Sequence, residues 1–243
     1  MPSLSHITAV ILAGGQGSRL RNSLPPGTPK ALADINGQPF LHILLDRLGS
    51  FGIGRVVLCT GYLGEVIQAT LGNRHGAIRL DYSREEAPLG TAGALANARP
   101  LLPSGPVLVM NGDSYCLADL EKFYNRFCGT TAEAAILLTR VADPGRYGRV
   151  EIDAAEHIVA FHEKRPDSGP GMINAGIYLF AESRLQALPE KRPASLEEDI
   201  FPALAGAAGP LLGYPTRAPF LDIGTPENYQ QAPAFFAGLD RTS

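Results

Sequence analysis

Cysteine is scarce in this chain, with three among 243 residues. Cys59, Cys116 and Cys128 are odd in number and widely spaced, which excludes a disulfide framework and a cysteine-rich zinc site. Free thiols of this kind are typical of a reducing compartment, so we expect a cytoplasmic protein. The N-terminus has no basic region followed by a long apolar one, so no signal peptide is expected.

Long apolar runs and a strong excess of charge are also missing. The apolar stretches are short, such as residues 9–13 and 107–110, and none could span a bilayer. The net charge is only −3, which gives no electrostatic footprint for nucleic acid or for an anionic membrane. We therefore expect neither nucleic acid nor a membrane as a partner. Hydrophobic residues make up 45% of the chain, as in ordinary globular proteins.

Short apolar runs alternate with amphipathic segments through the first half of the chain. Continuous or alternating apolar patterns predict strands at 7–12, 55–60, 78–82 and 106–110. Apolar spacing typical of one helical face predicts helices at 40–48, 65–71, 92–98 and 119–127. This rhythm of strand and helix indicates a mostly parallel sheet with crossover helices.

The second half has more strands and fewer helices. Strands are predicted at 135–140, 148–152, 158–162 and 173–180. A helix is predicted at 196–205, with Ser195 as its N-cap and Glu198 at the capping-box spacing. We expect one domain over 1–243: a nucleotide-binding half at about 1–133, an acceptor-binding half at about 134–225, and a C-terminal helix to about 237.

The strongest local signal directly follows the first strand, where residues 12–20 read LAGGQGSRL. Glycines let the backbone approach a polyphosphate, and their N–H groups can line an anion site. Ser18 and Arg19 can add a hydroxyl and a cation, and Lys30 follows closely enough to reach the same phosphates. The segment is neither a P-loop nor the dinucleotide fingerprint, since Leu20 replaces that motif's last small residue. A bare glycine turn is the simpler alternative.

Eight short motifs, taken in order, resemble the sugar-1-phosphate nucleotidylyltransferases. They are GGQGSRL (14–20), PKAL (29–32), PLGTAG (88–93), NGD (111–113), RYG (146–148), EK (163–164), NAGIY (174–178) and DIGT (222–225). The resemblance covers residues 7 to about 228. It implies an α/β fold with a Rossmann-like mixed, mostly parallel sheet flanked by helices, the nucleotide-diphospho-sugar transferase fold. It also implies transfer of a nucleotide from an NTP to a sugar 1-phosphate, with release of pyrophosphate and Mg²⁺ as cofactor.

The same resemblance implies roles for individual residues. Asp113 and Asp222 would hold Mg²⁺, and Arg19 and Lys30 would neutralise the triphosphate; these four are the expected catalytic residues. The nucleotide would be bound by Leu12, Ala13, Gly14, Gly15, Gly17, Ser18, Arg19, Lys30, Glu85, Pro88, Gly90, Thr91, Asn111 and Gly112. The sugar phosphate would be bound by Tyr147, Gly148, Glu163, Lys164 and Asn174. Taken alone, either aspartate could equally be a turn or N-cap residue.

Glu85 bears on the choice of base, because its segment runs along the base in this family. The Watson–Crick edge of guanine offers N1–H and N2–H₂ to one carboxylate, whereas thymine or uracil offers only N3–H. The run from Glu85 to Gly93 resembles GTP-using mannose-1-phosphate members. A uridylyl-transferring member that acts on N-acetylmuramate 1-phosphate can show a similar glutamate.

Two further runs bear on the acceptor. RYGRVE (146–151) and FHEK (161–164) resemble the D-glycero-D-manno-heptose 1-phosphate guanylyltransferases of bacterial surface-polysaccharide synthesis, such as lipopolysaccharide, capsule or S-layer glycan. The chain ends soon after Asp222, so no C-terminal left-handed β-helix is expected. We therefore expect GTP and the heptose 1-phosphate as substrates of a monomer or homodimer.

Three alternatives remain at this point. The first is a nucleotidyltransferase with other substrates, such as UTP with N-acetylmuramate 1-phosphate, or dTTP or UTP with a hexose 1-phosphate. The second is a non-catalytic nucleotide-sugar sensor, which need not keep both Asp113 and Asp222. The third is a Rossmann dehydrogenase, whose glycine fingerprint is absent.

Overall fold

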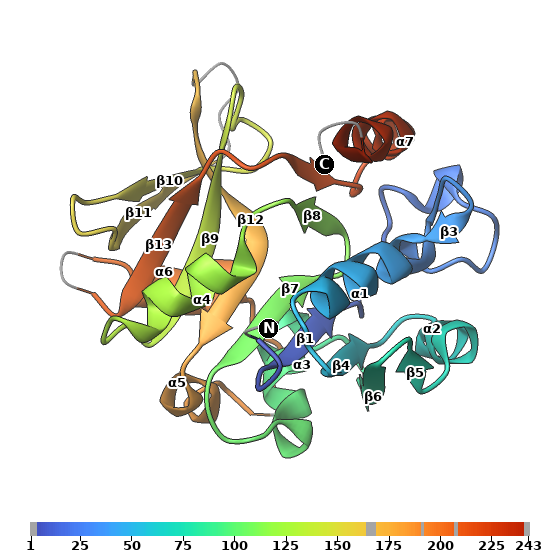
Figure 1. The fold of residues 1–243 in the computed structure, drawn as a ribbon, viewed down its shortest axis with the longest axis horizontal. Coiled ribbons are helices and arrows are strands. Elements are labelled where there is room, and N and C mark those ends of the chain that lie inside the picture. Colours follow the sequence, from blue (N-terminus) through green and yellow to red (C-terminus); the bar gives the residue numbers. More distant parts are fainter. Residues whose placement is uncertain (1–3, 164–168, 191, 207–208, 241–243) are drawn as a thin grey trace.

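The computed structural model in Figure 1 describes residues 4–163, 169–190, 192–206 and 209–240. A ten-stranded sheet runs through the molecule in the order β11-β10-β12-β7-β1-β4-β6-β5, and β9 joins β12 to β13 beside this path. Helices cover both faces of the sheet (Figure 1). The predicted α/β class, with a mixed sheet flanked by helices, is confirmed, and no β-helix occurs within these described residues.

The first half of the chain builds most of the parallel part of the sheet. Its strands are β1 (Thr8–Leu12), β2 (Asp34–Ile35), β3 (Gln38–Pro39), β4 (Arg55–Thr60), β5 (Arg74–His75), β6 (Ile78–Arg84), β7 (Val107–Asn111) and β8 (Ser114–Cys116). Its helices are α1 (Phe40–Ser50), α2 (Gly64–Leu71), α3 (Gly90–Ala98) and α4 (Leu120–Cys128).

The second half extends the same sheet, because β12 pairs with β7 in antiparallel register. Its strands are β9 (Ala134–Val141), β10 (Arg149–Ile152), β11 (Ile158–His162), β12 (Gly171–Phe180), β13 (Leu211–Thr216) and β14 (Phe220–Asp222). Its helices are α5 (Glu182–Gln186), α6 (Phe201–Leu204) and α7 (Pro226–Asp240). The division into nucleotide-binding and acceptor-binding halves stays a prediction.

Two hydrophobic clusters occupy the two faces of the sheet. One contains buried residues of α1, α2, α4 and α7, and the other contains those of α3 and α6. Neighbouring strand residues point to opposite clusters: Ile11 belongs to the first and Val10 to the second. Burial on both faces explains why the sequence of β1 is continuously apolar rather than alternating.

Several element boundaries differ from the prediction. The segment from Leu196 begins with a π-helical turn, Leu196–Ile200, and only then becomes α6. Ser195 caps it as predicted, but Glu198, at the capping-box spacing, does not accept the Ser195 N–H. The Ser195 N–H donates to Asp199 Oδ2 at 2.7 Å instead of to Glu198, because the wider turn brings the next carboxylate round to it. Helix α7 extends to Asp240, beyond the predicted end near 237.

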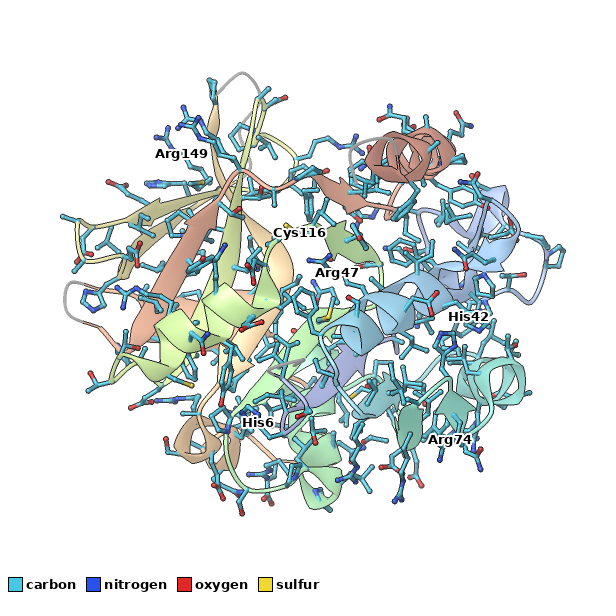
Figure 2. All side chains as sticks on the ribbon, in the orientation of Figure 1. His6, His42, Arg47, Arg74, Cys116 and Arg149 are labelled. Carbon is cyan, nitrogen blue, oxygen red and sulfur yellow. The ribbon has the colours of Figure 1, made fainter. Side chains whose placement is uncertain are left out.

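The short strands β8 and β14 form a separate antiparallel pair, which places Asp222 opposite Ser114. The N–H of Ile223 also donates to the carbonyl of Asp113 at 2.9 Å. Arg47 of α1 anchors this region, since its buried guanidinium donates to the Ala118 carbonyl; Figure 2 labels Arg47 where α1 faces β8. The strand pair therefore brings the segments that carry the two predicted metal ligands together.

Among the described residues, no helix combines the length and the apolar character needed to cross a membrane.

Candidate active site

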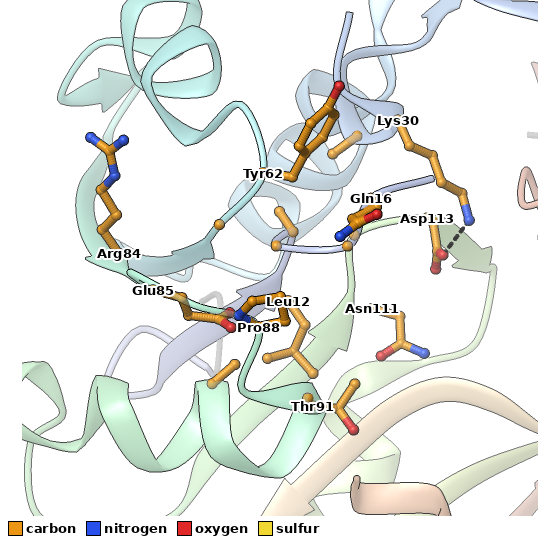
Figure 3. A pocket seen from close by; sticks show the side chains of 18 of the residues that line it. Leu12, Gln16, Lys30, Tyr62, Arg84, Glu85, Pro88, Thr91, Asn111 and Asp113 are labelled. Atoms are coloured by element: carbon orange, nitrogen blue, oxygen red, sulfur yellow. Dashed lines mark hydrogen bonds and ion pairs between the residues drawn. The ribbon is translucent and has the colours of Figure 1, made fainter. Parts of the chain in front are cut away.

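A cavity of about 930 Å³ lies at the carboxyl ends of the parallel strands (Figure 3). The register of β1, β4, β6 and β7 brings these ends to one edge, where Leu12 pairs with Asn111 and Thr60 with Arg84. The glycine-rich loop after β1, the segment between β6 and α3, and the turn after β7 form its walls. This edge is where open α/β sheets bind their ligands.

The glycine-rich loop approaches its neighbours too closely for side chains at some positions. A Cβ atom on Gly14 would lie 2.7 Å from Glu85 Oε1 and 3.3 Å from the Gly61 nitrogen. Gly17 has a φ of +57°, and its carbonyl accepts from the backbone nitrogen of Leu20. A Cβ on Gly15 would meet no atom within 4 Å, so this glycine leaves open space beside the cavity.

Glu85 supplies a half-buried carboxylate to one end of the cavity, opposite the end where Lys30 lies (Figure 3). Its Oε2 accepts from the Leu89 N–H at 2.8 Å. Burial raises the pKa of Glu85, and the Leu89 hydrogen bond acts in the opposite direction. No described residue donates a hydrogen bond to Oε1, so this oxygen can accept an N–H group from a ligand.

Charged side chains of both signs gather at the other end. Lys30 Nζ lies 2.5 Å from Asp113 Oδ2, and the lysine side chain is only 12% exposed. Asp222 Oδ1 accepts from the Gly224 N–H at 2.7 Å. Burial raises the pKa of Asp222 and so does nearby Asp113, whereas Lys30, the Gly224 N–H and Arg19 lower it. Two carboxylates and two cations therefore share this region.

The two carboxylates could hold part of a metal's coordination shell. Mg²⁺ is usually bound through one or two carboxylates, with substrate phosphates and water completing the octahedron. Asp113 and Asp222 offer such an incomplete oxygen set, and a cation between them would relieve the repulsion that raises the pKa of Asp222. No group of three or more acidic, histidine or cysteine side chains suited to a metal occurs in the described part of the chain. The residues thus fit a metal shared with phosphates.

Comparison with known proteins identifies the family. The family described as "Nucleotidyl transferase" matches residues 8–237. The chain belongs to the nucleotidyl transferase family. The predicted family membership is therefore confirmed.

Curated relatives of this nucleotidyl transferase come from different organisms. It is 36% identical over 231 residues to the "Mannose-1-phosphate guanylyltransferase" of Mycobacterium tuberculosis, which covers 94% of this chain but 64% of that protein. It is also 36% identical over 224 residues to the "D-glycero-alpha-D-manno-heptose 1-phosphate guanylyltransferase" of Aneurinibacillus thermoaerophilus. This match covers 92% of this chain and 96% of that protein. The chain thus spans less than two thirds of the mycobacterial relative and nearly all of the other.

A solved structure with the same fold is that of HddC from Yersinia pseudotuberculosis. The TM-score is 0.83 and the sequence identity 34%, covering 95% of this chain and 99% of that one. The same protein was also solved complexed with GMP-PN, and that structure matches with a TM-score of 0.82.

Most residues predicted to bind the nucleotide do meet at one cavity. Those that line it, together with Asp113, are Leu12, Ala13, Gly14, Gly15, Lys30, Glu85, Pro88, Gly90, Thr91, Asn111 and Gly112. Gly17, Ser18 and Arg19 are not among the lining residues. Arg19 is nevertheless close enough to Asp222 to lower its pKa, so it belongs to the charged end. The roles of all these residues stay predictions.

The residues predicted to bind the sugar phosphate are more dispersed. Tyr147 packs edge-on against Phe220 of β14. Burial raises the pKa of its phenol, the hydrogen bond from Asn228 lowers it, and the nearby Asp222 carboxylate raises it. Gly148, at a φ of +85°, turns the chain into β10. Glu163 lines another cavity, of about 730 Å³, beside β10 and β11. Lys164 lies outside the described residues.

Asn174 does not stand alone, because it belongs to a partly buried hydrogen-bond network. Its Nδ2 donates to Tyr178 OH at 3.0 Å, and this hydroxyl donates to Glu197 Oε1 at 3.0 Å. Thr91, which lines the main cavity, donates to Glu197 Oε2 at 2.8 Å. Tyr178 and Glu197 are absent from the predicted site residues, since nothing in their spacing links the NAGIY motif to the cap of a later helix.

Two neighbouring glycines give a direct test of the loop. Gly14→Ala is expected to lower stability by about 1 kcal/mol, because the new methyl group would lie 3.3 Å from the backbone nitrogen of Gly61 and would displace the flexible end of Glu85. Gly15→Ala is expected to leave stability unchanged but to raise the KM for the NTP, since its methyl group would project into space that a phosphate would need. Thermal unfolding and steady-state kinetics separate the two effects. Equal stability loss in both variants would contradict the geometry of the loop.

Proposed function

We propose that this nucleotidyl transferase is a guanylyltransferase that transfers GMP from GTP to D-glycero-α-D-manno-heptose 1-phosphate, forming GDP-heptose and pyrophosphate. The observation that carries the proposal is the cavity with a free carboxylate oxygen of Glu85 at one end and Lys30 with Asp113 at the other. This arrangement suits a nucleotide whose base lies at Glu85 and whose phosphates extend to Lys30.

Guanine is the base that Glu85 would recognise best. A carboxylate is an acceptor only, and guanine presents two adjacent donor groups to it. The names of the two curated relatives and the GMP-PN bound to HddC support a guanine nucleotide. Partial burial of Glu85 strengthens this discrimination, because an unpaired donor or acceptor there would be costly.

The charged end of the cavity would act by positioning the two substrates and by neutralising the charge of their phosphates. The second pKa of a phosphate monoester is about 6, so a sugar phosphate is largely a dianion at neutral pH and needs no general base. Lys30 and Arg19 would balance the triphosphate and the leaving pyrophosphate, and Asp113 and Asp222 would hold Mg²⁺. When bound, Mg²⁺ would supply Lewis-acid stabilisation of charge at the reacting phosphate. Tyr147, close to Asp222, would border the acceptor.

The acceptor is the finer part of the proposal. The heptose 1-phosphate is supported by the Aneurinibacillus relative, which matches over 96% of its own length. Mannose 1-phosphate is the second candidate, because the mycobacterial relative is equally similar at 36% identity. We propose that the product serves synthesis of a bacterial surface glycan.

One substrate screen tests the whole proposal. Pyrophosphate release would be measured with Mg²⁺, crossing GTP, ATP, UTP, CTP and dTTP with the 1-phosphates of the heptose, mannose, glucose and N-acetylmuramate. Release confined to GTP and the heptose phosphate is the expected result. Release with GTP and mannose 1-phosphate would replace the acceptor, and release with UTP or dTTP would overturn the assignment of Glu85. No release with any pair would favour a nucleotide-sugar sensor.

Replacing Glu85 tests the base contact separately. Glu85→Gln is expected to reduce the preference for GTP over UTP by about 1–3 kcal/mol, because one guanine donor would face an amide N–H₂. The readout is the ratio of kcat/KM for the two nucleotides. Glu86→Gln, one residue further along the same cavity wall, is the control and should change this ratio little. An unchanged ratio in the Glu85 variant would place base recognition elsewhere.

A further inference from the structure

Glu197 is the centre of a polar network that none of the expected roles explains. Its carboxylate accepts hydrogen bonds from three hydroxyl groups: Thr91 at 2.8 Å, Ser195 at 3.1 Å and Tyr178 at 3.0 Å. Thr91 comes from the start of α3, Tyr178 from near the C-terminal end of β12, and Ser195 precedes the π-helical turn. Glu197 therefore ties the main cavity to the strand that also carries Asn174.

The direction of these bonds fixes the role of Tyr178. Its side chain is fully buried, and burial together with the charge of Glu197 raises its pKa well above the usual value. The phenol thus stays protonated and donates its one hydrogen to Glu197. Its oxygen can then only accept, and it does so from Asn174 Nδ2 at 3.0 Å and Asn111 Nδ2 at 3.4 Å.

Both asparagine amides are oriented as a result. With Nδ2 directed at Tyr178, each Oδ1 must face the other way. Asn174 Oδ1 accepts the Gly176 N–H at 2.8 Å, in a bulge of β12 where Gly176 has a φ of +71°. Asn111 Oδ1 is buried and accepts no hydrogen bond from any described residue. A buried acceptor without a donor is costly, which suggests that a ligand supplies one.

The position of Asn111 indicates what the donor would be. Asn111 lines the cavity between Asp113 and Thr91, and Glu85 lies on the opposite wall (Figure 3). Between the base end and the phosphate end of a bound nucleotide lies its ribose, whose hydroxyl groups can donate. Leu12, beside Asn111 in the sheet, offers only an apolar side chain to the same space.

We infer that Glu197 is a positioning residue, which acts through Tyr178 to hold the Asn111 amide with Oδ1 as an acceptor for a ribose hydroxyl of the nucleotide. This inference rests on the proposed function for the placement of the nucleotide. It adds a specificity: the site selects ribonucleotides over deoxyribonucleotides. Glu197 itself does not touch the ribose.

The test compares the affinity for GTP with that for 2′-deoxy-GTP and 3′-deoxy-GTP, by calorimetry without any sugar phosphate. In the wild-type protein, removing the recognised hydroxyl is expected to weaken binding about tenfold, the equivalent of one good hydrogen bond. In Glu197→Gln, the new amide can donate to the Tyr178 oxygen, which frees the phenol hydrogen and lets Asn111 turn. The ratio of affinities should then fall to about twofold or less.

Two further variants distinguish positioning from a merely structural role. Tyr178→Phe removes the acceptor of both amides and should reduce the same affinity ratio. Ser195→Ala removes another hydroxyl from the Glu197 carboxylate, but it leaves the bond to Tyr178 in place. Because Ser195 also caps the π-helical turn, this control should lower the unfolding temperature without changing the affinity ratio.

The possible outcomes separate the inference from the proposed function. A full ribose preference in both Glu197→Gln and Tyr178→Phe would overturn the inference, even if GTP is the substrate. A wild-type protein that binds both deoxy analogues as tightly as GTP would overturn it as well. If the substrate screen selects UTP, the proposed function fails, and the same ratios measured with UTP and its deoxy analogues decide the inference.

Discussion

Asp113→Asn and Asp222→Asn are each expected to lower kcat/KM by on the order of 1,000-fold at saturating Mg²⁺. Charge stabilisation by a bound metal is worth several kcal/mol, and about 1.4 kcal/mol corresponds to a factor of ten in rate. Asparagine keeps the shape of the side chain but loses the negative charge that would hold the cation. Steady-state pyrophosphate release measures the effect, and near-normal rates in both variants would contradict the two-carboxylate mechanism.

The same Asp222 substitution is expected to increase stability at neutral pH. The pKa of Asp222 is raised in the folded protein by its burial and by Asp113, so folding favours the protonated form. Such a group stabilises the fold below its ordinary pKa of 3.8 and loses this contribution as the pH rises through the raised value. Asp222→Asn should therefore unfold at a higher temperature than wild type at pH 7, and the difference should vanish in acid.

Asp81 provides a matched control, because its pKa is shifted in the opposite direction to that of Asp222. Burial acts to raise its pKa, but the ion pairs with Arg55 and Arg79 outweigh this and hold the pKa below its ordinary value. A lowered carboxyl pKa stabilises the fold above the ordinary value and loses this contribution in acid. Asp81→Asn should therefore lose stability at pH 7 and keep its activity. Asp222→Asn without any stability gain at pH 7 would contradict the described charge environment.

The fold could be predicted from the sequence where burial of an element requires a recognisable pattern of apolar residues. β1 and β4 are apolar throughout because both faces are covered, and α1 shows a clear apolar stripe, so each was predicted within about two residues. β8 and β14 have three residues each, too few for any periodicity. Their pairing depends on contacts between distant segments, and these contacts bring Asp113 and Asp222 together.

The candidate site, like the fold, could be predicted from the sequence only where a local pattern marks it. The glycine-rich loop follows a strand directly, so both the loop and its place at the sheet edge were predictable. The place of Asp222 followed from resemblance, because nothing in its own segment indicates a ligand. Tyr178 and Glu197 have ordinary local surroundings, one in a buried strand and one beside a helix cap. Only the bulge in β12 and the packing of the π-helical turn against α3 bring them into hydrogen-bond contact.

Lys30→Met is expected to lower kcat/KM by on the order of 100- to 1,000-fold, the usual effect of removing a preorganised group that stabilises developing charge. Lys30 is the cation in contact with Asp113, and it also lowers the pKa of Asp222. Without it, the pKa of Asp222 should rise further, so activity should fall off at a higher pH on the acidic side. A pH–rate profile therefore separates loss of this cation from simple loss of a phosphate contact.

Arg21→Met is the matched control for Lys30. Arg21 is a cation at the end of the same loop, but its guanidinium lies over the Tyr62 ring, 5.1 Å from the ring centroid, and forms no ion pair with a described residue. Its removal should change kcat/KM by less than about threefold, because a single exposed charge is worth little in water. If Arg21→Met and Lys30→Met lost activity equally, general attraction of the triphosphate would explain Lys30 better than its contact with Asp113. If only Lys30→Met loses activity strongly, and the acidic limb of its pH–rate profile moves to higher pH, the reaction depends on the Lys30 cation beside Asp113 and Asp222.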